Sequence, residues 1–106
     1  MYNHQAFIKA IEEKKLVKVR FNSFEKGVIE RVCVPFDFVP SSRARNQENK
    51  YQFYDLNSPN GEHNLPLFPF QIVSINILQE VFDPAVYITW NAPYNWKIRR
   101  EWGIYS

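Results

Sequence analysis

The first stretch of the chain with a regular hydrophobic period runs from about Asn3 to Lys15. Phe7, Ile8 and Ile11 recur at helical spacing and fall on one face. Asn3 is a favourable N-cap residue, so we expect a helix to begin there. A helix with one apolar stripe is unstable in isolation, and this helix should therefore pack against the rest of the chain.

After the helix the hydrophobic period changes to two, which is typical of a strand with one buried face. Val17, Val19 and Phe21 alternate with polar residues in the first such stretch. Gly27 follows at a turn, where glycine tolerates a positive φ. The pattern predicts five strands, at about 16–24, 28–39, 50–56, 65–70 (short, because prolines interrupt it) and 72–81.

The second predicted strand has an apolar face and a mixed face. We expect the apolar face to hold Val32, Val34, Phe36 and Phe38, and the mixed face to hold Arg31, Cys33 and Asp37. Pro35 lies within this strand and has no N–H to donate, which predicts an edge position, a bulge or a bend. A bend there would suit a small barrel.

The C-terminal segment begins with Asp83-Pro84, an N-cap followed by proline at the first helical position. Beyond it, Trp90, Trp96 and Trp102 recur every six residues, a spacing that fits neither helix nor strand. One interpretation is that two of the three indoles complete the core of the domain. The other is that the tail presents them to a partner.

The length of 106 residues fits one domain, and we expect residues 1–106 to form it. The predicted fold is mainly β (α+β): a helix at about 3–15 packed on a small five-stranded SH3/Sm-like barrel at about 16–82, then a short helix and an aromatic tail at 83–106. Cys33 is the only cysteine, and its apolar neighbours favour a buried thiol over a reactive one. No segment has the pattern of a signal peptide or a membrane span, so we expect a cytoplasmic protein.

Candidate catalytic groups are sparse. The two histidines, His4 and His63, have no partner at the spacing of metal ligands, and there is no glycine-rich phosphate loop. Asp37 and Asp55 both fall in predicted strands, but a carboxylate pair without a motif is normally structural. We therefore expect a protein that is not an enzyme and that has no metal or other cofactor.

The order of these elements resembles the WYL domain. The similarity rests on a helix leading into a strand, an Arg-x-x-x-Pro strand, an aromatic strand and an apolar final segment, at 7–21, 31–35, 51–56 and 67–75. WYL domains are Sm-like β-barrels with an SH3-type core, found mainly in bacterial transcription regulators and phage-defence proteins. The resemblance thus implies a standalone, divergent WYL-like domain of bacterial type.

The same resemblance implies an anionic ligand, since WYL domains are thought to sense nucleotides or single-stranded nucleic acid. Arg31 matches the arginine of the family's second strand, which helps form its basic ligand face. Two positions depart from the family pattern. Residues 49–53 lack the Trp-Tyr-Leu triplet, and Gln71 stands where an arginine is usual.

A single strand binds by stacking its bases on aromatic rings while cations follow its phosphates. We expect Arg20, Arg31, Gln52 and Tyr54 to share the sheet face opposite the core and to form such a surface. The competing interpretation is that the two arginines pair with nearby acids on a solvated sheet. The candidate ligand-binding residues are Arg20, Arg31, Arg43, Arg45, Tyr54 and Gln71.

A second hypothesis is a protein-interaction or self-assembly module, with a protein partner or a homodimer. Tryptophan, tyrosine and arginine are the residues most enriched at interface hot spots, and the tail concentrates them. Its candidate interaction residues are Trp90, Trp96 and Trp102.

Overall fold

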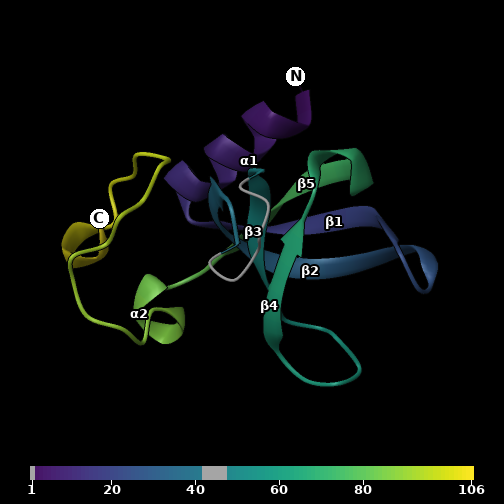
Figure 1. Cartoon of the computed structure of the whole chain (residues 1–106). Helices are drawn as coiled ribbons and strands as arrows, with labels where there is room; N and C mark the ends of the chain where they lie inside the picture. The colour runs from purple at the N-terminus through teal and green to yellow at the C-terminus, as the bar shows by residue number, and fades with distance from the viewer. Residues whose placement is uncertain (1, 42–47) are drawn as a thin grey trace.

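The computed structural model describes residues 2–41 and 48–106 of the chain (Figure 1). A helix at the N-terminus packs on a five-stranded antiparallel sheet, which confirms the predicted mainly β, α+β class. The elements are α1 (Tyr2–Glu13), β1 (Lys15–Ser23), β2 (Gly27–Val39), β3 (Lys50–Asp55), β4 (His63–Leu67), the 3-10 turn η1 (Pro69–Gln71), β5 (Ile72–Val81), α2 (Pro84–Tyr87) and the 3-10 turn η2 (Gly103–Tyr105). None of the helices in these described ranges is long and apolar enough to cross a bilayer.

The strands lie in the order β4-β3-β2-β1-β5, so β4 and β5 are the two edges of the sheet. In a flat five-stranded sheet, the edge strands would lie about 19 Å apart. Only residues 68–71 join β4 to β5, and three of them form η1, in which the chain rises only about 2 Å per residue. The sheet must therefore curl, and in Figure 1 the β4 arrow runs steeply across β1 and β2. Within the described ranges no backbone pairing joins β4 to β5, so hydrogen bonds do not close the sheet into a barrel.

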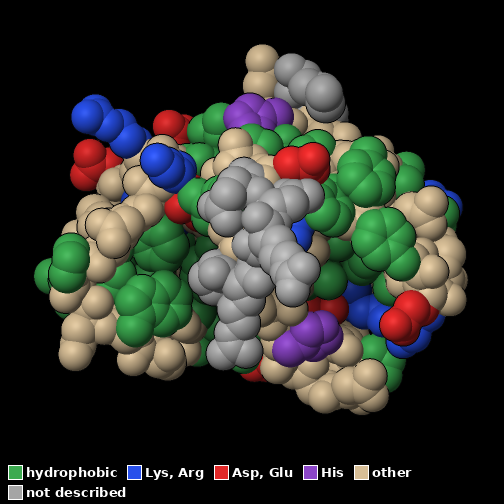
Figure 2. Space-filling model, in the orientation of Figure 1, with side chains coloured by type: hydrophobic (Ala, Val, Ile, Leu, Met, Phe, Trp, Pro, Cys, Tyr) green, Lys and Arg blue, Asp and Glu red, His purple; other side chains and the backbone are tan. Residues whose placement is uncertain are grey.

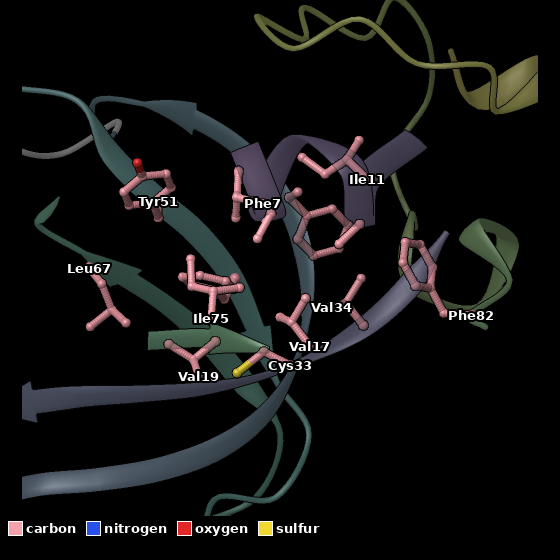
Figure 3. Packing of buried hydrophobic residues seen from close by; sticks show 14 of the residues in the cluster. Phe7, Ile11, Val17, Val19, Cys33, Val34, Tyr51, Leu67, Ile75 and Phe82 are labelled. Atoms are coloured by element: carbon pink, nitrogen blue, oxygen red, sulfur yellow. The ribbon is translucent and has the colours of Figure 1, made fainter. Parts of the chain in front are cut away.

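The core lies between α1 and the concave side of the sheet. Phe7 and Ile11 are fully buried, and Figure 3 shows both beside the helix, above the strands that hold the other core residues. The ring of Phe7 meets those of Tyr51 and Phe53 edge-on, at centroid distances of 4.8 and 5.2 Å. Of the stripe predicted from the sequence, Phe7 and Ile11 thus cover the core, whereas Ile8 is only half-buried.

The helix ends two residues earlier than predicted. Lys14 has a φ of 55°, in the left-handed region, and its N–H donates to the carbonyl of Ile11 at 3.2 Å. This turn ends the helix and directs the chain into β1 at Lys15. The fourth strand is also shifted, to His63–Leu67, because Pro69 starts η1.

The bulge expected near Pro35 is present in β2. Pro35 pairs with Phe53 and Asp37 with Gln52, so Phe36 is the extra residue on the β2 side. The bulge changes which side chains face the core along the second half of the strand.

The predicted faces of β2 are wrong before this bulge. Cys33 pairs with Val17 and Arg31 with Val19, and directly paired residues share a face. Both therefore lie on the core side with the buried valines, and Val32 lies outside. The sequence does not fix this choice, because β2 carries apolar residues in both phases of its alternation.

The tail begins as predicted, since the Asp83 side chain accepts a hydrogen bond from Ala85 N at 3.0 Å and caps α2. It then returns toward α1, where Trp102 is only 3% exposed. The indole Nε1 of Trp102 donates to the carbonyl of Ile11 at 2.8 Å. Trp102 thus belongs to the core.

Candidate ligand-binding groove

An open groove of about 1180 Å³ lies between the outer face of β2–β4 and the tail. In Figure 2, hydrophobic side chains gather over the tail at the left of the view, and the surface is hollowed beside them. Most of its apolar lining is aromatic, and we call it the aromatic groove. Its rings are Phe36, Phe53, Tyr54, Tyr87, Trp90, Tyr94 and Trp96.

Strand alternation supplies one side of the aromatic groove. Tyr51, Phe53 and Asp55 of β3 are buried, so Gln52 and Tyr54, which alternate with them, face outward, as predicted. Across the groove, the ring of Tyr54 lies 5.7 Å from that of Tyr87 at the end of α2, tilted by 57°. The sheet and the tail thus meet at this pair of tyrosines.

Trp90 is the most accessible indole of the tail, at 48% exposed. Its ring lies 6.1 Å from that of Trp96 and 6.5 Å from that of Phe36. The Nε1 atoms of Trp96 and Trp102 donate to the carbonyls of Tyr105 and Ile11. Among the described residues, the Nε1 of Trp90 has no such partner. This side chain can therefore contact a ligand through its ring edge and also donate a hydrogen bond to it.

A buried ion pair holds the tail in place beside the sheet. The Asp37 carboxylate accepts hydrogen bonds from the backbone N–H groups of Lys97 and Ile98, both at 2.9 Å. It also lies 3.7 Å from Nη2 of Arg100, whose side chain is 1% exposed. The guanidinium stacks between two rings, 4.0 Å from the centroid of Trp96 and 4.5 Å from that of Trp102.

Arg100 keeps its charge at neutral pH despite this burial. Burial lowers the pKa of Arg100 to about 10, and the Asp37 carboxylate opposes that shift. The tail wall of the groove is therefore fixed by a charged, desolvated contact rather than by ring packing alone.

The charged groups that line the groove within the described ranges are both acidic. The Asp37 carboxylate already binds two N–H groups of the tail and faces Arg100, whereas Glu62 is exposed and has no ion-pair partner within these ranges. Burial, followed by the charges of Glu62 and Tyr54, raises the pKa of Tyr87, so these three groups lie close together. No lysine or arginine of the described chain lines the groove. Its charge suits a neutral or cationic ligand better than the anion expected from the sequence.

The structure does not bring the predicted ligand-binding arginines together. Arg20 is exposed and pairs across the strands with Glu30 on the outer face. Arg31 lies on the opposite face, where its Nε is 3.4 Å from a carboxylate oxygen of the buried Asp55. The prediction that these two arginines share a face is wrong, and Arg31 has the ion-paired role of the competing interpretation.

Gln71 is also engaged internally. Its Oε1 accepts from Phe68 N at 2.9 Å, and its Nε2 donates to the carbonyl of Asn22 at 3.1 Å, which ties η1 to β1. Arg43 and Arg45 lie outside the described residues. Of the four predicted ligand-binding residues that the structure describes, Tyr54 is the one that lines the groove, together with Trp90 and Trp96 of the tail.

The cysteine and the two histidines considered for chemistry are not among the residues that line the groove. Cys33 is fully buried, and this burial raises the pKa of its thiol. His4 Nδ1 lies 2.9 Å from the Tyr51 hydroxyl, and His63 Nδ1 lies 3.0 Å from the carbonyl of Gly61. The described part of the chain holds no cluster of three or more His, Cys, Asp or Glu residues that could bind a metal ion.

Glu62 and Tyr87 are among the groove residues that were not predicted from the sequence. Glu62 follows a turn and carries no local signal of its place. Tyr87 ends the helix that Asp83 caps, but which side of that helix meets the sheet depends on tertiary packing. The strand and tail segments that form the groove are separated by some thirty residues of sequence, beyond the reach of periodicity.

Comparisons with protein-family models, with curated proteins and with solved structures find no match to this chain.

Proposed function

We propose that this chain is a non-catalytic binding module that takes a segment of a partner protein into the aromatic groove. The observation that carries the proposal is the half-exposed indole of Trp90, whose N–H has no partner among the described residues. Exposed aromatic residues with a polar group are the usual anchors of protein interfaces. The Asp37–Arg100 contact supports a preformed site, because it fixes the tail wall before any ligand binds.

A finer assignment of the fold goes with this proposal. The short connection between the two edge strands supports a curled, SH3/Sm-like sheet. The WYL-like order of elements agrees with that assignment. A cytoplasmic location is proposed from the single unpaired cysteine, Cys33, since reducing compartments keep thiols free.

Panning a random peptide library against the folded protein tests the proposal. We expect peptides to be enriched on the wild type and to be lost from Trp90→Ala. Phe70→Ala is the matched control, because Phe70 is 73% exposed and lies outside the groove. Equal enrichment on the Trp90 variant, or none on the wild type, would contradict the proposal.

The second candidate is a nucleotide or single-stranded nucleic acid. Its specific support is that Tyr54 and Trp90 offer ring faces in one groove, and bases stack on such rings. Titration of a labelled single-stranded oligonucleotide at low and moderate salt distinguishes the two candidates. Salt-sensitive binding that is lost in Tyr54→Ala favours the nucleic acid, whereas no binding at low salt removes it.

A further inference from the structure

Three hydrogen-bond donors on the aromatic rings of the groove have no partner among the described residues. Tyr54, Tyr87 and Trp90 all line the groove, and neither the hydroxyls nor the indole N–H is hydrogen-bonded within the described chain. A well-matched ligand therefore supplies acceptors to these groups. The unpaired carboxylate of Glu62, in the described lining of the groove, can in turn accept from a donor of the ligand.

A proline-rich segment has this pattern of groups. Proline has no backbone N–H, and a polyproline II helix makes no internal hydrogen bonds, so its carbonyls remain free to accept. Aromatic-lined grooves bind such segments, and the ligand loses little conformational entropy because it is already extended. The repeated backbone carbonyls of such a ligand match the three ring donors of the groove that have no partner among the described residues.

The rings of the groove also suit the apolar side of such a ligand. Tyr54 and Tyr87 are tilted by 57° to one another, and Phe36 and Trp90 by 59°. Tilted pairs leave angular notches between their ring faces, in contrast to the near-parallel stack of Phe36 on Trp96 at 8°. A flat, compact proline ring can pack into a notch of this kind.

The carboxylate of Glu62 in the groove lining indicates a further feature of the ligand. Glu62 is exposed, has no ion-pair partner among the described residues, and lies close enough to Tyr87 for its charge to act on that hydroxyl. A cation placed here gains both a carboxylate and two tyrosine ring faces. No described lysine or arginine lines the groove to oppose it.

We propose that the aromatic groove binds an extended, proline-rich segment of a partner protein that carries an arginine or lysine beside the Tyr54–Tyr87 pair. This inference rests on the proposed function of the groove and names the chemistry of its ligand. Trp90 and the tilted ring pairs contact the prolines, and Glu62 contacts the basic residue.

Fluorescence polarisation with three labelled peptides tests the inference. The first is an oligoproline that carries arginines, the second has glutamine in place of each arginine, and the third has alanine in place of each proline. The wild type should bind the first peptide most tightly. Trp90→Ala should weaken that binding by about tenfold or more, whereas Phe70→Ala leaves it within about twofold.

Glu62→Gln gives an independent arm of the same experiment. It should weaken binding of the arginine peptide by about two- to fivefold at low salt and leave the glutamine peptide unchanged. Salt should reduce the difference between wild type and Glu62→Gln, because the contact is exposed.

The outcomes separate this inference from the function on which it rests. If the alanine peptide binds as tightly as the proline peptide, or if Trp90→Ala has no effect, the inference is overturned. If library panning yields peptides that require Trp90 but the oligoproline does not bind, the groove binds proteins of another chemistry, and only this inference fails. If no peptide binds in either experiment, both fail.

Discussion

Replacement of Asp37 by alanine should release the tail from the sheet. The carboxylate accepts two tail N–H groups at 2.9 Å and faces the guanidinium of Arg100, which is 1% exposed. A hydrogen bond to a charged group contributes roughly 1.5–3 kcal/mol, and loss of one partner of a buried ion pair costs roughly 3–5 kcal/mol. These contributions overlap, so we expect Asp37→Ala to lower the free energy of unfolding by about 3–5 kcal/mol. That is a large part of the roughly 5–15 kcal/mol typical of a domain.

Urea titration followed by both tryptophan fluorescence and far-ultraviolet circular dichroism measures this effect. Trp96 and Trp102 flank Arg100, so the fluorescence transition should move to lower urea than the dichroism transition if the tail detaches first. Asp37→Asn retains an acceptor oxygen and should be less destabilised than Asp37→Ala. Asp83→Ala removes an exposed helix cap and serves as the control, with an expected cost of about 0.5–2 kcal/mol. A loss below about 1 kcal/mol for Asp37→Ala would show that this carboxylate does not hold the tail, because a buried charge left without its partner must cost more.

Trp102→Ala should lower the free energy of unfolding by about 3–5 kcal/mol in thermal or urea unfolding, since the side chain is a buried part of the core; an unchanged transition would place it outside the core. Arg31→Ala should lower the free energy of unfolding by about 1–3 kcal/mol, because it leaves the buried Asp55 without its cation. Arg20→Ala should change that free energy by no more than about 0.5 kcal/mol, and equal effects of the two substitutions would contradict the ion pair. The raised pKa of Cys33 means that, above about pH 8.5, the unfolded chain releases the thiol proton that the folded chain retains. Between about pH 8.5 and 10, stability should therefore fall as pH rises, by up to about 1.4 kcal/mol per pH unit, and Cys33→Ala should lack that slope; a wild-type stability that is flat with pH would argue against burial of the thiol.

The parts of the fold that were predictable from the sequence rest on local signals. The stripe of Phe7 and Ile11 predicts the helix, and the alternation around Tyr51 and Phe53 predicts the outward face of β3. Pro35 predicts the bulge because a missing N–H disturbs any ladder, wherever the strand lies. Each of these signals acts within a few residues and needs no knowledge of the tertiary fold.

No local signal in the sequence indicates which face of β2 holds Arg31. Ile29 and Cys33 alternate in one phase of β2, and Val32 and Val34 alternate in the other, so both faces of the strand are apolar enough to be buried. Register with β1 decides between them, and register is a tertiary property. The buried Asp55 then accounts for an arginine on the core side, because it supplies the charge that Arg31 requires.

The candidate site was predicted only in fragments for the same reason. Tyr54 and the tail tryptophans were assigned to two separate surfaces, and the structure joins them across one groove. The spacing of six residues between the tryptophans matches neither the helical nor the strand period, because the tail is mostly irregular. Trp90 is exposed, Trp96 forms a wall of the groove, and Trp102 lies in the core.

The hydrogen bond between Trp102 and the carbonyl of Ile11 has a consequence for folding during synthesis on the ribosome. Its partners are 91 residues apart, and at a synthesis rate of about 5–20 residues per second the indole is made roughly 5–18 s after the carbonyl. During that interval the indole that contacts the end of α1 is missing, although Ile11 is fully buried in the native state. The C-terminal end of α1 thus lacks its native cover for seconds, and the domain completes its core only when translation has passed Trp102.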